Sequence, residues 1–233
     1  MLARCTPMRD LLRKISVTGA IALGLLAPIR GYALTGEQVF EPRLLALLPP
    51  YCKYTQIFRE RMAGGNNAAE IERWTNLMGP TFIHMHHYCL GLMNTYRAAI
   101  LAKTQQDRVH NLGNSILEFD YVIRNATPDF SLLPEILTRK GESLIRLDRG
   151  AEGVAELQNA ISRSPDFWEP YAAMSDYYRD LGQVAKAREW AEKGLSAAPD
   201  SRALMRRVTA LGGGGSKQKS ASGSSRKSTA SPN

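Results

Sequence analysis

The chain has 233 residues, of which 44% are apolar and 22% are charged, and its formal net charge is +8. The positive excess lies at the two ends, because residues 1–33 carry five basic and one acidic side chain and residues 212–233 carry four basic and no acidic ones. Residues 34–211 carry 21 of each sign, so the body of the chain has no net basic charge, which argues against a folded nucleic-acid-binding module.

The first 33 residues have the pattern of a secretory signal peptide. Four basic side chains within residues 1–14 precede an apolar stretch over residues 15–29, and a small-residue site ends at Ala33. We expect cleavage after Ala33 and export to the bacterial periplasm or beyond the cell. The alternative is an uncleaved leader that anchors the chain in the inner membrane, although fifteen apolar residues are fewer than the roughly 20 that a membrane-spanning helix needs.

Two cysteines remain after removal of the leader, Cys52 and Cys89. An isolated pair in an oxidising compartment predicts a disulfide. It would join an N-terminal extension, residues 34–79, to the helix that carries Cys89. Within the extension we expect an extended lead-in over residues 34–50, followed by one or two short helices over residues 56–78.

Residues 80–130 have the pattern of a pair of long helices. Apolar side chains recur with helical spacing over residues 82–103, and a turn is expected at residues 104–107. A second periodic stretch contains Phe119 and ends before Pro128. We therefore expect two helices here that are longer than those of the pairs that follow.

Residues 134–167 and 168–201 superpose on each other with a shift of 34 residues. The matched positions are Leu137, Gly141, Leu144, Gly153, Leu157, Ala160, Ile161 and Pro165 in the first unit, and Tyr171, Ser175, Tyr178, Gly182, Ala187, Ala191, Gly194, Leu195 and Pro199 in the second. Both units resemble the tetratricopeptide repeat (TPR), in which two helices occupy 34 residues and a proline closes each unit. The first unit departs from the pattern at Gly150, the glycine of its turn, which comes two positions late, and at Gly153, where alanine is usual.

The resemblance implies an all-α fold, a TPR-like superhelix of antiparallel helix pairs in which the upstream pair is a divergent, longer unit. After the second unit, residues 202–211 predict a short capping helix. Leu204 and Val208 fall on one of its faces, while Arg206 and Arg207 are expected to point away.

Residues 212–233 are rich in serine and glycine and contain no large apolar side chain, which predicts a disordered tail. Its four positive charges offer at most a weak contact with a membrane or another anionic surface. One hypothesis is that this tail holds the protein at the cell wall or at a polysaccharide, in which case its deletion would release the protein.

The resemblance also implies a partner-binding site on the concave wall of the stack, which the first helix of each unit lines. At the matched positions the wall residues are Glu135, Thr138, Glu142, Ile145, Arg146, Glu169, Ala172, Asp176, Arg179 and Asp180. The wall lacks the lysines and asparagines with which some repeats clamp a carboxylate. Because it is acidic with a few arginines, a basic or mixed-charge peptide, or a helix of a protein partner, fits it better.

Residues 84–89 hold three of the four histidines of the chain. A metal site would take His84 and His87 from this helix and His110 from the next one. We prefer a structural role for the histidines, because their spacing matches no ligand pattern and Cys89 is assigned to the disulfide. The sequence contains no nucleophile elbow, phosphate loop, dinucleotide-binding motif or zinc-protease motif, so we expect neither an enzyme nor a cofactor.

Together these features predict a periplasmic TPR adaptor or scaffold that binds protein partners non-covalently in an envelope-associated assembly. The alternative is a metal-binding or redox-associated factor that uses the cluster of His84, His86 and His87. Bound metal that is lost on replacement of His84 and His87 would favour the alternative.

Overall fold

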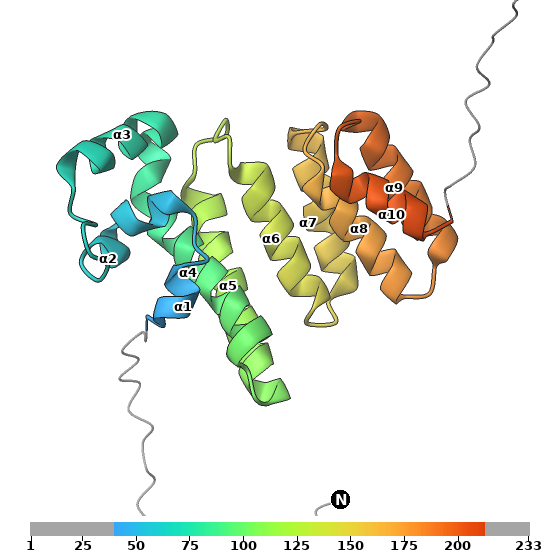
Figure 1. Ribbon diagram of the computed structural model, residues 1–233, viewed down its shortest axis with the longest axis horizontal. Coiled ribbons are helices and arrows are strands. Elements are labelled where there is room, and N and C mark those ends of the chain that lie inside the picture. Colours follow the sequence, from blue (N-terminus) through green and yellow to red (C-terminus); the bar gives the residue numbers. More distant parts are fainter. Residues whose placement is uncertain (1–39, 213–233) are drawn as a thin grey trace, which may run out of the picture. The chain divides into compact units, whose positions relative to one another are not determined.

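The computed structural model describes residues 40–212, so the predicted signal peptide and the predicted tail beyond Gly212 lie outside the described residues (Figure 1). Every regular element within the described range is helical, as the sequence predicted. In the same part of the chain, no helix is long and apolar enough to cross a membrane.

Five short elements form the N-terminal segment, residues 40–84. They are α1 (Pro42–Leu45), the 3₁₀ helix η1 (Pro50–Tyr54), α2 (Gln56–Arg59), α3 (Ala68–Met78) and the 3₁₀ helix η2 (Gly79–His84). The short helices predicted within residues 56–78 are present. The lead-in differs from the prediction, because α1 forms a helical turn that Pro42 favours at its first position and that buries Leu44.

The disulfide predicted between Cys52 and Cys89 is present, with a Cα–Cα distance of 5.8 Å. It joins η1 to α4 (Met85–Tyr96), and both half-cystines are fully buried. Phe58 and Tyr88 belong to the same core cluster as the bridge. The N-terminal segment is thus fixed to the first long helix both covalently and by apolar packing.

The long helix pair predicted over residues 80–130 consists of α4, a π-helical turn η3 (Arg97–Leu101) and α5 (Gln105–Asn125). Helix α5 begins where the sequence predicted a turn. The Thr104 hydroxyl accepts a hydrogen bond from the Asp107 backbone N–H, and the Asp107 carboxylate accepts one from the Thr104 N–H. This capping box satisfies N–H groups that the first helical turn leaves free, so the helix starts at this point.

Two further helix pairs follow. They are α6 (Leu133–Ile145) with α7 (Gly150–Arg163), and α8 (Glu169–Asp180) with α9 (Val184–Ala197). Helices α7 and α9 are offset by 34 residues at both ends (184 − 150 and 197 − 163), so the sequence repeat is also a structural repeat. Helices α6 and α7 cross where Gly141 faces Gly153, and a Cβ atom at Gly153 would lie 2.7 Å from the Gly141 carbonyl oxygen. Glycine stands where alanine is usual because this crossing leaves no room for a methyl group.

The turns of the two pairs adopt the same conformation with different residues. Asp148 has φ +59°, and Gly182, which follows it by 34 positions (182 − 148), has φ +74°. Aspartate is among the few non-glycine residues that occupy this left-handed region with some frequency. Gly150 serves another purpose, because a Cβ atom there would overlap the Tyr177 hydroxyl oxygen. The late glycine of the first unit therefore does not shift its turn.

Helix α10 (Arg202–Ala210) packs on α8 and α9 as the predicted cap. Leu204 is fully buried in a cluster with Tyr171. One expectation is wrong: Arg206 is exposed, but Arg207 faces α8, where its guanidinium binds the Asp176 carboxylate. The rotation of α10 about its axis is set by this ion pair together with the burial of Leu204.

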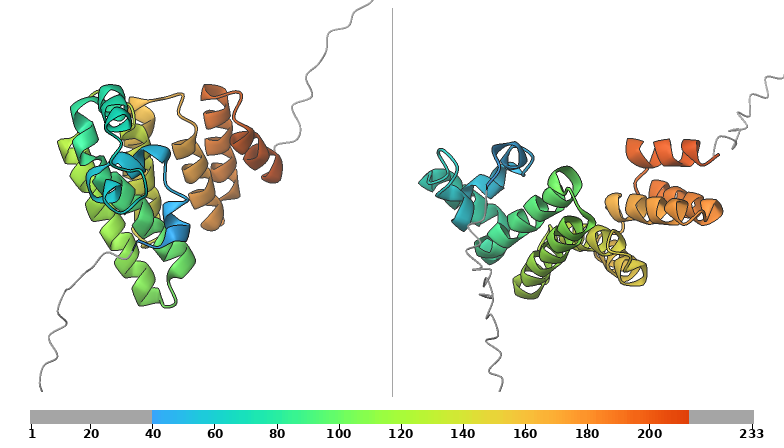
Figure 2. Two further views of the ribbon diagram at one scale, coloured as in Figure 1. Left: turned by 60° about the vertical axis from the view of Figure 1, so that its left-hand side comes forward. Right: turned by 90° about the horizontal axis from the view of Figure 1, so that it is seen from below.

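Consecutive helices from α4 to α10 contact each other, and every second helix also contacts the next, so that α4, α6, α8 and α10 form a contiguous row. Figure 1 and the two views of Figure 2 show this succession. The first helices of the predicted units are therefore neighbours, which places their side chains on one shared face.

Candidate functional site

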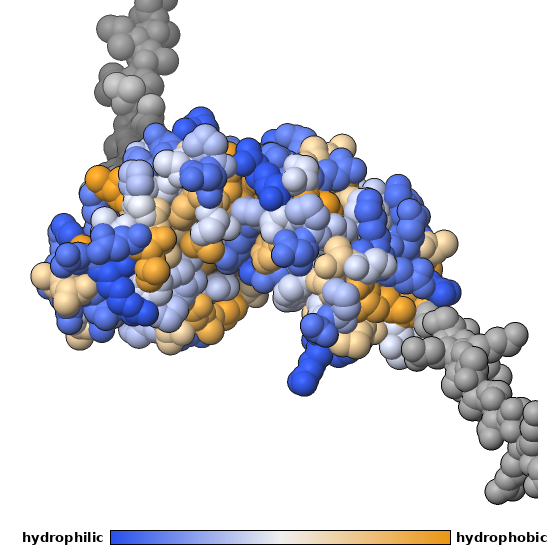
Figure 3. Space-filling model, turned by 90° about the horizontal axis from the view of Figure 1, so that it is seen from above, coloured by the Kyte–Doolittle hydropathy of each residue, from blue (hydrophilic) through white to orange (hydrophobic). Residues whose placement is uncertain are grey.

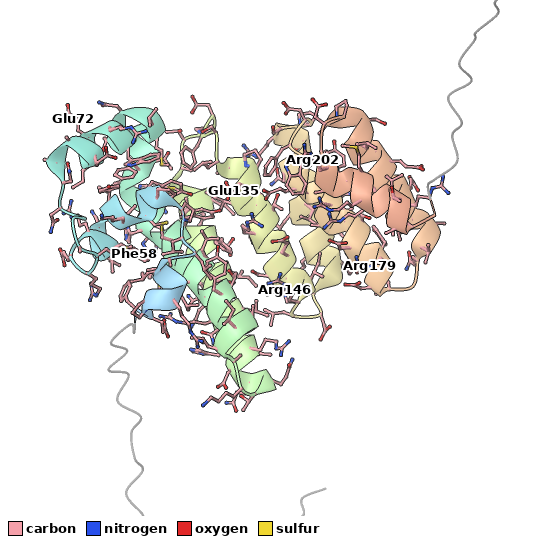
Figure 4. The ribbon with its side chains drawn as sticks, viewed as in Figure 1. Phe58, Glu72, Glu135, Arg146, Arg179 and Arg202 are labelled. Atoms are coloured by element: carbon pink, nitrogen blue, oxygen red, sulfur yellow. A yellow bond between two sulfur atoms is a disulfide. The ribbon has the colours of Figure 1, made fainter. Side chains whose placement is uncertain are left out.

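Charged side chains link the helices of this row. We define the charged face by Glu135, Arg139 and Glu142 of α6, Glu169, Asp176, Arg179 and Asp180 of α8, and Arg207 of α10. Figure 4 shows Glu135 on α6 and Arg179 on α8, two of its members. Arg139 and Arg207 were not among the wall residues predicted from the sequence, whereas the other members were.

Two predicted wall residues are inaccessible to a partner. Thr138 is fully buried, and its hydroxyl donates a hydrogen bond to the Pro134 carbonyl oxygen at 2.8 Å. Ala172 is also buried, in a cluster with Leu204 of α10. Both side chains are short and lie where helices pack, so these positions contribute to the core and not to a binding surface.

Ile145 and Arg146 lie at the C-terminal end of α6. Ile145 is half-buried and packs against the cluster that contains Leu157. Arg146 is exposed and, with Arg108 of α5, lines a cavity of about 370 Å³. It provides a positive group at the end of α6 opposite to Glu135, as Figure 4 shows.

Arg139 is the centre of the α6 half of the charged face. Its guanidinium lies 2.9 Å from Glu169, 3.3 Å from Glu142 and 4.0 Å from Glu135. Burial disfavours its charged form, but the carboxylates outweigh this effect and raise the pKa of Arg139 above its ordinary value. The sequence signal for this network is the spacing of Glu135, Arg139 and Glu142, which places them on one side of a helix.

Tyr88 of α4 extends the network to a third helix. Its hydroxyl donates to Glu135 Oε1 at 2.6 Å, and burial, reinforced by the negative charge of Glu135, raises the tyrosine pKa well above its usual range. Tyr88 therefore stays a neutral donor. Burial also raises the pKa of Glu169, an effect that the charge of Arg139 opposes. Three carboxylates against one guanidinium leave this half with an excess of two negative charges.

The α8 half of the charged face is electrically balanced. Asp176 accepts hydrogen bonds from Arg179 Nη1 at 2.7 Å and from Arg207 Nη2 at 2.5 Å, and Asp180 accepts one from Arg179 Nη2 at 2.9 Å. Arg179 and Asp180 are the most exposed members, with 50% and 68% of their side chains accessible. The wall expected to be acidic is thus acidic over α6 and the start of α8 and neutral beyond.

The histidines of residues 84–89 join α4 to α5. His87 Nδ1 lies 2.5 Å from Glu118 Oε2, and the His87 ring stacks on Tyr121 with the ring centroids 3.7 Å apart. Burial and the neighbouring His87 lower the pKa of His86 to about 4. These contacts assign the cluster to the packing of one helix against the next.

The metal site considered from the sequence, His84 with His87 and His110, is not assembled. His87 contacts Glu118, whereas His110 precedes Glu118 by eight residues (118 − 110), which is about 12 Å of helix. Between residues 40 and 212, no group of three or more His, Cys, Asp or Glu side chains is placed to hold a metal ion. The metal-binding alternative therefore loses the site on which it depended.

Two observations decide the fold of residues 133–197: the helix pairs share a 34-residue offset, and their first helices contact each other. It is TPR-like. Among solved structures, the crystal structure of a thermophilic TPR protein from Thermus thermophilus is similar to this chain, with 17% sequence identity, a TM-score of 0.48, and coverage of 66% of this chain and 76% of that chain. No protein-family model matches the chain, and no curated protein matches it by sequence.

Proposed function

We propose that this protein is an exported, non-enzymatic adaptor that binds a protein partner on the charged face. The observation that carries the proposal is the network of ion pairs across α6, α8 and α10, on a face formed by the first helices of TPR-like pairs. Stacked helix pairs present extended surfaces that suit a peptide or a helix of a partner. An adaptor or scaffold role follows from the fold, and the charges indicate the chemistry of the partner.

The charges favour a partner segment with basic residues opposite α6. Arg139 neutralises only one of the three carboxylates around it, so an approaching lysine or arginine meets Glu142 and Glu169 with negative charge to spare. Along α8, Arg179 and Asp180 offer one exposed group of each sign. A mixed-charge segment, basic at one end, therefore complements the whole face.

The disulfide supports both the binding role and the compartment. It fixes the N-terminal segment to α4, the helix whose Tyr88 holds Glu135 in place. A surface that is already ordered loses less conformational entropy when a partner binds. Disulfides persist in oxidising compartments, so the bridge is consistent with the exported protein that the leader predicts.

The test is a quantitative pulldown from detergent-solubilised envelope under oxidising conditions, with the double variant Glu142→Lys/Asp180→Lys as bait. Neither residue joins two helices, because Glu142 pairs with Arg139 of its own helix and Asp180 with the adjacent Arg179. Asp176 is unsuitable because it holds α10 through Arg207.

The matched control is Glu189→Lys, a charge reversal at an exposed residue of α9, which lies outside the row of first helices. We expect a partner that is retained equally by the wild type and the control and reduced at least tenfold by the double variant. Equal recovery by all three proteins would place the binding site elsewhere. Export is tested separately by the mass of the mature chain, which begins at Leu34 if the leader is cleaved after Ala33.

A further inference from the structure

A cavity of about 510 Å³ opens in the N-terminal segment, lined by residues of η1, α2, α3 and η2. Its volume is within the range of about 300 to 1,000 Å³ that is usual for small-molecule sites. Ile71 of α3 and Phe82 and Ile83 of η2 supply apolar lining. None of these residues belongs to the charged face, so the cavity is a separate feature of the molecule.

The apolar surface around this cavity is incompletely covered by the rest of the described chain. Helix α3 contains no buried residue, although Ile71 and Trp74 pack against the core from its surface. Ile83 is 55% exposed, and Leu77 of α3 is 63% exposed. Small apolar patches among hydrophilic side chains are visible on the face shown in Figure 3. An amphipathic helix left this open has apolar surface available for a ligand.

One cation stands at the cavity. Arg59 is the only charged residue that lines it, and no described residue pairs with its guanidinium. The other arginines nearby are engaged: Arg61 donates to the Ile57 carbonyl oxygen, and Arg73 pairs with Glu70. The cavity thus combines an apolar wall with a single positive group and no lining carboxylate.

The hydroxyl groups of the lining threonines do not compete for a ligand. Thr55 donates to the Cys52 carbonyl oxygen at 2.8 Å, and Thr75 donates to the Ile71 carbonyl oxygen at 2.8 Å. Both donors are therefore already used by the backbone. Arg59 remains as the group that orients a ligand, and it selects for negative charge.

We propose that this cavity binds a monocarboxylate with an unbranched apolar chain, of the fatty-acid type. The chain lies against Ile71, Phe82 and Ile83, and the carboxylate pairs with Arg59 at the mouth. The complementarity is specific: one anionic group meets one unpaired cation, and methylene groups meet apolar side chains. Each buried methylene group is expected to tighten binding about fourfold until the cavity is filled.

The experiment titrates the purified, oxidised full chain with octanoate, decanoate and dodecanoate below their micelle concentrations, by calorimetry and by tryptophan fluorescence. Trp74 is a local reporter, because it lies on α3 between the lining residues Ile71 and Thr75. Dodecylamine has the same chain with the opposite charge. We expect saturable binding with one site, an affinity that rises with chain length, and binding of the amine at least tenfold weaker.

Two variants and a control locate the site. Arg59→Gln removes the cation and should weaken dodecanoate binding at least tenfold, while Thr75→Trp fills the cavity and should abolish binding. Arg73→Gln is the matched control, since Arg73 lies on α3 but does not line the cavity, and it should bind as the wild type does. If Thr75→Trp fails to fold, Ile83→Glu at an exposed lining residue replaces it.

Three results would overturn the proposal. The first is no saturable binding by any of the acids, and the second is equal affinity for dodecanoate and dodecylamine. The third is unchanged dodecanoate binding in folded Arg59→Gln or in the folded cavity-blocking variant, which would place the acid elsewhere on the protein.

Discussion

Arg207 of α10 binds Asp176 of α8 through two hydrogen bonds, from Nε to Oδ1 at 3.1 Å and from Nη2 to Oδ2 at 2.5 Å. The pair is the polar counterpart of the burial of Leu204 beneath the last helix. It connects the end of the stack to the charged face, because Asp176 also accepts a hydrogen bond from Arg179. The orientation of the capping helix and the chemistry of the candidate site thus depend on the same carboxylate.

Replacement of Arg207 by alanine should loosen α10. A bidentate, partly buried arginine–carboxylate pair contributes about 1 kcal/mol, and its loss also leaves Asp176 with one partner fewer. We expect a lower free energy of unfolding in urea and faster hydrogen exchange in α10. Arg206→Ala is the control, since Arg206 is exposed on the same helix. Equal effects of the two variants would contradict a role for the ion pair.

Loss of the disulfide should destabilise the protein by about 3–4 kcal/mol. This figure follows from the 37-residue separation of Cys52 and Cys89, because the bridge restricts the unfolded chain. The double variant Cys52→Ser/Cys89→Ser is compared with the wild type by denaturant unfolding under oxidising conditions. Cys5→Ser in the unprocessed chain should leave stability unchanged, and a similar loss with Cys5→Ser would argue that another pairing exists.

Two glycines in the α4–α5 pair should respond to alanine in opposite directions. A Cβ atom at Gly91 would overlap the Phe119 ring, so Gly91→Ala should cost about 1–3 kcal/mol through overpacking. Nothing lies within 4 Å of a Cβ atom at Gly113, so Gly113→Ala in α5 should stabilise by about 0.5–1 kcal/mol through helix propensity. Thermal unfolding of both variants measures the difference, and a stabilised Gly91→Ala protein would show that the helices are not packed this closely.

Stability should fall in mild acid because of His86. Burial and the neighbouring His87 lower its pKa from 6.5 to about 4, so the unfolded chain takes up a proton that the folded protein does not accept until lower pH. Its contribution to stability is therefore complete above pH 6.5 and is lost as the pH falls toward 4. Unfolding free energies measured across this window should show a shallower slope for His86→Gln. His110→Gln, on the exposed side of α5, should keep the wild-type slope.

The sequence predicted the features that depend on spacing along a helix. Leu157 and Ala191 sit at matched apolar positions of the two repeats, and both are fully buried. The disulfide was also predictable, because only Cys52 and Cys89 remain once the leader is removed. In both cases the decisive quantity is a residue type at a known interval, which a sequence displays directly.

The candidate site was less predictable because it depends on how helices are rotated and where long side chains point. Thr138 and Arg139 are neighbours on α6, yet Thr138 is buried and Arg139 is the centre of the charged face. Arg206 and Arg207 differ in the same way on α10. One position along a helix is a rotation of about 100°, and tertiary packing fixes which neighbour faces the next helix.

The central claim is that a protein partner binds on the charged face, and site-specific photocrosslinking tests it most directly. A photoreactive phenylalanine derivative is placed at position 142, on the charged face, or at position 189, on α9, in the oxidised protein within the intact envelope. The account predicts a discrete crosslinked partner at position 142, which disappears when Asp180→Lys is added, and none at position 189. Crosslinking to the same partner with equal yield at both positions, or at position 189 alone, would contradict it.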